Sequence, residues 1–238
     1  MALPRFFDRV FAAAGRRLSV DRASLEHALR EKSVRILCGP ECAEAGNARW
    51  IAELLTNLCA RLYPRLALDA DAETAAHLGK IARGVNPQIS LRTLPGEATA
   101  TACVGSVAVV PPRAIFASAS GWVADVRFQR PEMEEASLPN PYAAGAAAAL
   151  AAGEIFRHVF AEQLPDVGLA RDVRVSLLDY SNGAGRDRAL APLDLGPVAF
   201  VGLGAVGGPA LWALARHPSL SGDAFLVDPD SIELSNLQ

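Results

Sequence analysis

Residues 196–208 of this 238-residue chain read GPVAFVGLGAVGG, and this stretch decides the fold. The apolar residues before the glycines predict a buried strand, and the residues after them predict a helix over 209–216. Three glycines lie between them with the spacing of a nucleotide-binding turn: Gly202, Gly204 and Gly207. We expect Gly202 to make the tight turn, Gly204 to let a phosphate approach the backbone, and Gly207 to let helix and strand pack closely. The helix N-terminus would attract that phosphate.

The residues that follow this helix narrow the choice of nucleotide. A second apolar strand, residues 224–227, ends at Asp228, 21 residues after Gly207, where a carboxylate can accept hydrogen bonds from both ribose hydroxyls. Asp230 and Asn236 follow in a polar segment. A dinucleotide site needs only one acid at this strand end, so the second acid favours ATP with Mg²⁺, a cation that carboxylates suit. A NAD-dependent oxidoreductase that uses the same turn is the alternative.

The first 182 residues alternate apolar strands with amphipathic helices. Residues 34–71 predict a strand, a helix over 48–63 and a strand over 66–68, which is one crossover unit of a parallel sheet. Asn140 and Pro141 signal a helix start, because Asn caps a helix and Pro suits its first position. The other expected elements are helices over 72–83 and 140–163 and strands over 88–91, 102–110, 114–118, 122–128 and 173–178.

These elements predict an α/β chain with a Rossmann-like, mostly parallel sheet flanked by helices. Residues 183–192 lack periodicity and are the expected linker between a first domain, 1–182, and a second, 193–238. A strand–helix–strand piece of that size cannot bury its own faces. Either the chain is a truncated product, or we expect this piece to lean on the first domain or on another chain.

The second domain resembles a known family. The three glycines, followed by VDPDSIELSNL at residues 227–237, look like the nucleotide site of ThiF/MoeB-type adenylyltransferases, which include the ubiquitin-activating enzymes. The resemblance implies a site for Mg-ATP in which Gly202, Gly204 and Gly207 line the phosphates. It also implies that Asp228 holds the ribose, and that Asp230 and Asn236 lie beside the phosphates.

The first domain resembles the same family more faintly. The turn that follows the strand at residues 34–38 reads CGPECAEAG over 38–46, with the glycine spacing lost and with Glu41 and Glu44 where a phosphate would lie. Carboxylates there would repel phosphate, so residues 1–182 are interpreted as an inactive adenylation-like domain. An inactive domain followed by an active one is similar to bacterial ubiquitin-activating-like enzymes of antiviral conjugation operons.

The resemblance also implies an activity and a set of partners. The whole protein would adenylate the C-terminus of a ubiquitin-like protein, associate as a homodimer, and pass its product to a conjugating-type enzyme. This chain holds none of the family's catalytic residues. The Arg that contacts phosphate, the Lys, the metal-binding Asp and any thioester Cys are expected beyond Gln238, so the chain alone is expected to be inactive. A pseudo-adenylation module that only binds a partner is a further alternative.

Composition excludes several other classes. A hydrophobic fraction of 51% supports a real core, and a net charge of -3 argues against nucleic acid or anionic membrane partners. The N-terminal 17 residues predict an amphipathic surface helix, and the most apolar stretch, 142–153, is shorter than the ~20 residues that a bilayer requires. We expect a cytoplasmic, soluble protein.

The four cysteines predict neither disulfides nor a metal site. Cys38, Cys59 and Cys103 lie in apolar runs and are expected in the core, whereas Cys42, in a loop, is expected to be the most exposed. Cys38 and Cys42 lack the further ligands that zinc requires.

Overall fold

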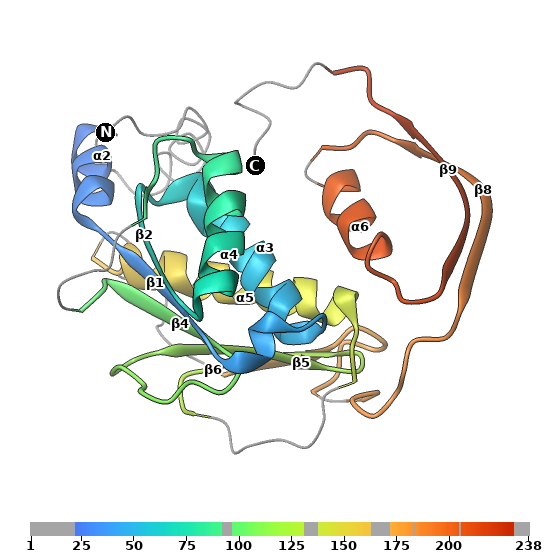
Figure 1. The fold of residues 1–238 in the computed structure, drawn as a ribbon, viewed down its shortest axis with the longest axis horizontal. Helices are drawn as coiled ribbons and strands as arrows, with labels where there is room; N and C mark the ends of the chain where they lie inside the picture. The colour runs from blue at the N-terminus through green and yellow to red at the C-terminus, as the bar shows by residue number, and fades with distance from the viewer. Residues whose placement is uncertain are drawn as a thin grey trace.

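The computed structural model describes residues 22–91, 97–130, 138–162, 172–182, 184–204 and 206–230. It contains a seven-stranded sheet in the order β3-β2-β1-β4-β5-β6-β7 and a separate pair, β8-β9 (Figure 1). The helix predicted near the N-terminus and the site residue Asn236 lie outside the described residues.

The large sheet is mostly parallel, as the alternation of strands and helices predicts. β1 pairs in parallel with β2 and β4, while β6 pairs antiparallel with β5 and β7. Its strands are β1 (Val34–Cys38), β2 (Arg65–Asp69), β3 (Ser90–Leu91), β4 (Ala100–Val104), β5 (Ile115–Ser120), β6 (Val123–Arg127) and β7 (Val173–Ser176). The direction of connection reverses between β1 and β4, and ligands of open α/β sheets bind at such a switch point.

Three helices cover one face of this sheet, namely α3 (Asn47–Leu62), α4 (Ala72–Val85) and α5 (Pro141–Val159). Alternate strand residues therefore enter two different cores. Ile36 and Ile115 belong to the large core beneath the helices, whereas Cys103 and Phe116 pack in a small cluster with Val107 and Ala114 from the loop after β4. A further helix, α2 (Arg22–Glu31), precedes β1, and a short 3₁₀ helix, η1 (Pro40–Ala43), follows it.

The central helix α5 depends on small side chains. Ala143, Ala144, Ala147, Ala148 and Ala151 are all fully buried. Because alanine has only a methyl group, the α5 backbone lies close to both α3 and the sheet, and this close packing keeps dispersion contacts dense.

The predicted elements that fall within the described residues are present, with different ends. β4 stops at Val104 and not at residue 110, because Gly105 has a φ of 75° and turns the chain out of the sheet. The helix that begins at Pro141 ends at Val159, short of the predicted residue 163. The last strand, β9, begins at Leu220, four residues before the predicted start.

The second unit is a parallel pair of strands, β8 (Leu193–Val201) and β9 (Leu220–Val227), joined by α6 (Gly207–Leu214). The α6 helix lies between this pair and the first unit, where it contacts α5 (Figure 1). The piece thus packs against the first unit, which is one of the expected alternatives.

Two buried asparagines join α3, α5 and β5. The Asn47 side chain donates to the carbonyls of Ala119 and Leu138 at 2.8 and 2.9 Å and accepts from the Asn140 backbone N–H at 2.7 Å. Asn140 caps α5 by accepting from the N–H groups of Tyr142 and Ala143 at 2.9 and 3.2 Å, as its position before Pro141 predicts. The role of Asn47 has no comparable signal in the sequence.

We expect Asn47→Ala to lower the free energy of unfolding by about 2–4 kcal/mol, because three buried groups lose their partner. Chemical denaturation monitored by circular dichroism measures this loss. Asn57→Ala on the same helix is the matched control: Asn57 only accepts one bond from Arg61, at 2.9 Å, and should cost less than about 1 kcal/mol. Equal losses in the two variants would contradict the assignment.

Candidate functional site

The glycine-rich turn after β8 has the geometry that its spacing predicts. Gly202 has a φ of 86°, a left-handed conformation that favours glycine. A Cβ at Gly207 would overlap the Gly202 carbonyl oxygen, so glycine is required where α6 begins against β8. Among the residues that the structure describes, no atom lies within 4 Å of a Cβ built at Gly204, so that position faces open space there.

Asp228 folds back onto this turn. One carboxylate oxygen accepts from the Leu203 backbone N–H at 2.6 Å, and the other accepts from the Asp230 N–H at 2.9 Å. These two bonds lower the pKa of the exposed Asp228 carboxyl. The structure therefore brings the end of β9 to the turn after β8. Each carboxylate oxygen keeps further acceptor capacity toward a ribose hydroxyl.

The remaining predicted site residues are placed only in part. Asp230 is exposed directly after β9, and Asn236 lies outside the described residues. Within the described ranges, no group of three or more His, Cys, Asp or Glu side chains is arranged to hold a metal ion. Asp228 and Asp230 are thus two carboxylates beside the turn, and a bound cation would need most of its ligands from elsewhere.

The second and third glycines of the turn predict different responses of Tm to an added methyl group. Gly207→Ala should disrupt the turn and lower Tm by at least about 2 °C, because the new Cβ overlaps the Gly202 carbonyl. Gly204→Ala should leave Tm within about 1 °C of wild type, since its Cβ enters open space. Thermal unfolding of both variants measures the difference, and a larger loss for Gly204→Ala would contradict this geometry.

The corresponding turn in the first unit is built differently. The carboxyl ends of β1 and β4 meet there, and the Gly39 N–H donates to the Val104 carbonyl at 2.7 Å. Cys42, expected to be exposed, is buried at 2% exposure, and its thiol lies 3.6 Å from the Val104 carbonyl. The exposure prediction was wrong because η1 turns the side chain inward. Cys38, Cys59 and Cys103 are partly or fully buried free thiols.

The acids after β2 also differ from Asp228 and Asp230. Asp71 caps α4 by accepting from the N–H groups of Glu73 and Thr74, both at 3.0 Å. Asp69 pairs with Arg35 at 3.4 Å. In the first unit, therefore, the acid after the second strand supports a helix, and no acid reaches back to the turn after β1 among the bonds that the structure gives.

A charged cluster joins the second unit to the first at Glu53 of α3. This carboxylate accepts a hydrogen bond from Arg49 at 3.1 Å, and it lies 2.8 Å from His77 Nε2. It also accepts from Arg216, which follows α6 in the second unit, at 3.1 Å. Burial would raise the pKa of Glu53, but the bonds from His77, Arg49 and Arg216 outweigh it and lower the pKa. A pocket of about 220 Å³ lies beside this cluster, between α3 and α4.

Aromatic contacts complete the same interface. The Arg216 guanidinium lies 4.2 Å from the centre of the Trp212 ring, and a Cβ at Gly145 of α5 would be 3.3 Å from that ring. His217 makes an edge contact with Tyr142, whose ring stacks on Trp122 at 5.9 Å. The helix that carries the glycine turn is thus docked by an ion pair and by ring packing.

The lowered pKa of Glu53 makes this docking pH-dependent. Its stabilisation is complete above the unfolded value of 4.5 and is lost as pH falls through the lower folded pKa. We expect Glu53→Gln to lower the free energy of unfolding by about 1–3 kcal/mol at pH 7 and by less at pH 3. Denaturant unfolding at the two pH values measures this. Glu73→Gln is the exposed control, and a loss for Glu53→Gln that is equal at both pH values would contradict the assignment.

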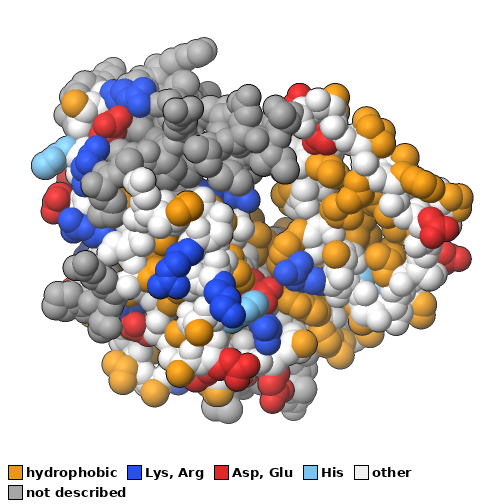
Figure 2. Space-filling model, turned by 45° about the horizontal axis from the view of Figure 1, so that its top comes forward, with side chains coloured by type: hydrophobic (Ala, Val, Ile, Leu, Met, Phe, Trp, Pro, Cys, Tyr) orange, Lys and Arg blue, Asp and Glu red, His pale blue; other side chains and the backbone are white. Residues whose placement is uncertain are grey.

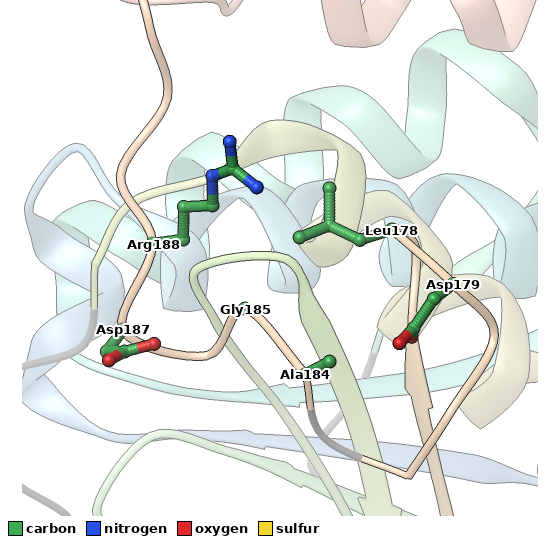
Figure 3. A pocket seen from close by; sticks show the side chains of 6 residues that line it. All are labelled: Leu178, Asp179, Ala184, Gly185, Asp187 and Arg188. Carbon is green, nitrogen blue, oxygen red and sulfur yellow. The ribbon is translucent and has the colours of Figure 1, made fainter.

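A second pocket lies between the residues that follow β7 and the segment expected to be the linker. It is a shallow hollow of about 570 Å³ between the turns after β7 (Figure 3). Leu178 and Arg188 lie on one side, and the carboxylates of Asp179 and Asp187 lie at opposite ends (Figure 3). No buried polar group points into it among the residues that line it, so we do not assign chemistry to this hollow.

The β8–β9 pair is apolar and exposed. Phe225, Leu226 and Val227 are 62%, 51% and 50% exposed, and Val201 is 75% exposed. Figure 2 shows hydrophobic side chains gathered over this unit. No helix in the described part of the chain has the length and apolar character needed to cross a membrane.

Comparison with solved structures agrees with the observed fold. Three structures of Escherichia coli MccB are similar to this chain at 12% identity. They were solved with ATP (TM-score 0.54, 74% of this chain and 70% of that chain), with succinimide (0.55, 76% and 70%) and alone (0.55, 74% and 68%). The chain thus shares the Rossmann-like α/β fold of these structures.

The sequence comparisons define the family. The model of prokaryotic E2 family C matches residues 39–161, more than half of the chain, and the chain belongs to that family. The protein y4jF of Sinorhizobium fredii is 36% identical over 248 residues, which cover 100% of this chain and 47% of that protein. The chain thus spans about half the length of this curated relative. The family match lies within the first unit, whereas the glycine turn of the second unit lies outside it.

Proposed function

We propose that this chain is the N-terminal part of a ubiquitin-activating-like enzyme, which uses Mg-ATP to adenylate the C-terminus of a ubiquitin-like protein for conjugation. The turn after β8 supports this proposal most directly. Gly202 bends the chain there, Gly204 leaves open space, and the Asp228 carboxylate accepts a hydrogen bond from the Leu203 N–H. The MoeB/ThiF Rossmann-like fold, found in a structure of MccB with ATP, supports a nucleotide at this place.

The turn residues have separate roles in this proposal. The space at Gly204 admits a phosphate group to the backbone at the N-terminus of α6, whose dipole favours an anion. Asp228 accepts from the ribose with its remaining lone pairs, and Asp230 is the exposed second acid. Mg²⁺ would neutralise phosphate charge when bound. In the reaction, a carboxylate oxygen of the partner's C-terminus bonds to the α-phosphorus, and pyrophosphate leaves.

The two units have different roles in the proposal. Residues 1–182 act as an inactive adenylation-like domain that supports the active one through Glu53, Arg216 and Trp212, and residues 183–192 link them. Membership of prokaryotic E2 family C supports a place in ubiquitin-like conjugation. The ubiquitin-like substrate, a conjugating-type partner, a homodimer and a cytoplasmic, antiviral setting belong to this proposal as well.

The exposed strands support a nucleotide unit that is larger than residues 193–238. Phe225 and Leu226 on β9 are more than half exposed, and within the described part of the chain no strand pairs with the outer edge of β8 or of β9. Further strands on these edges would bury those side chains. We propose that the whole protein supplies such strands, along with the Arg, Lys, Asp and any Cys that complete the chemistry.

ATP–pyrophosphate exchange by the whole protein with its ubiquitin-like partner tests this function. Asp228→Ala and Gly204→Ala should each lower exchange by at least about tenfold, which corresponds to the loss of one or two bonds to the nucleotide. Asp223→Ala, an exposed acid on β9, is the control and should exchange at the wild-type rate. Exchange unaffected by Asp228→Ala, or binding of NAD without ATP, would overturn the proposal.

A further inference from the structure

The turn after β1 holds a second small site that the proposed function does not use. It lies at the carboxyl ends of β1 and β4, where Cys38 pairs with Val104 and the sheet connections reverse direction. This switch point is the usual place of a ligand in an open α/β sheet. The residues around it are Gly39, Gly105 and Ser106, with Glu41 beside them.

The Glu41 carboxylate lies where two glycines leave room for an oxygen. A Cβ at Gly105 would be 2.5 Å from Glu41 Oε2, and a Cβ at Gly39 would be 2.6 Å from the same atom. Gly105 also has a φ of 75°, which disfavours other residues. A Cβ at Gly39 would also overlap the Ser106 backbone nitrogen and lie 2.7 Å from the Ser106 carbonyl oxygen, so the Ser106 backbone requires glycine at this position as well.

A backbone donor faces the same oxygen. The Ser106 N–H donates to Glu41 Oε2 at 2.9 Å. Burial would raise the pKa of the Glu41 carboxyl, but hydrogen bonding with Ser106 outweighs it and lowers the pKa, which favours the anion. An oxygen anion, two glycines and a backbone N–H together are the parts of a phosphate-binding turn.

We propose that Gly39, Gly105 and Ser106 form an oxyanion site of the phosphate class, which the chain's own Glu41 carboxylate occupies. The carboxylate takes the place of a phosphate oxygen and closes the site to outside anions. The site stands apart from the glycine turn at Gly202, so this inference is independent of the proposed adenylating activity.

Removal of the carboxylate tests the site directly in the full 238-residue chain. In chloride, Glu41→Ala should lower Tm by about 2–6 °C, because the Ser106 N–H loses its acceptor. Sodium phosphate at the same ionic strength should restore at least half of that loss. The Tm of wild type should rise much less in phosphate. Phosphate bound at the glycine turn after β8 would raise the Tm of both proteins equally, so the difference between their Tm values reports only the site at Glu41.

Glu44→Ala is the matched control, because Glu44 is an exposed acid of the same loop. It should change neither Tm nor the response to phosphate. Sodium formate, which resembles the lost carboxylate, is the second arm. Recovery in phosphate supports the proposal, whether or not formate also restores Tm. Recovery in formate alone would overturn the phosphate class, and no recovery in either anion would overturn the site.

A small neutral residue keeps the test decisive if Glu41→Ala does not fold. Glu41→Ser removes the charge and leaves the site open to an outside anion. We expect Glu41→Ser to lose stability in chloride and to gain Tm in phosphate relative to wild type. An absence of that gain would overturn the proposal, because the Glu41 carboxylate would then only tie the loop to Ser106.

Discussion

The buried amide of Asn47 is the contact on which the arrangement of the first unit depends. It joins the start of α3 to the end of β5 and to the cap of α5, so three elements far apart in the sequence share one side chain. An amide that donates twice and accepts once can fill this place only in one orientation. With α5 fixed, its alanine face rests on the sheet and its opposite side is available to Trp212.

The second unit is held against α3 and α5 of the first unit by an ion pair and by aromatic packing. The Glu53 carboxylate forms an ion pair with Arg216 across the interface and a second ion pair with Arg49 of its own helix, α3. A buried carboxylate of this kind stabilises the structure only while its partners remain in place. The position of the glycine turn relative to the first unit is therefore coupled to a few side chains of α3 and α5.

The sequence predicts the architecture well because its signals are local. Alternating apolar strands, the Asn140 cap and the glycine spacing each depend on neighbours in the chain, and the Rossmann-like, mostly parallel sheet is confirmed. Contacts between distant residues have no such signal, so the roles of Asn47 and Glu53 emerge only from the structure. The exposure of Cys42 was wrongly predicted for the same reason, since a single 3₁₀ turn decides which way its thiol points.

In the candidate site, too, the sequence predicts the local features but not the contacts between residues far apart in the chain. The left-handed Gly202 and the tight contact at Gly207 follow from spacing, because both are properties of the backbone. The bond from Leu203 to Asp228 joins two strand ends, and only the pairing of β8 with β9 brings them together. The roles of the site residues toward a nucleotide stay predictions.

The unpaired β8–β9 ribbon has a practical consequence for work with the isolated chain. Among the described residues, each outer strand edge presents free backbone donors and acceptors beside exposed Phe225 and Leu226. Two such ribbons can pair edge to edge without any recognition between specific side chains. We therefore expect the isolated chain to self-associate as its concentration rises, whether or not a ligand is bound at the turn.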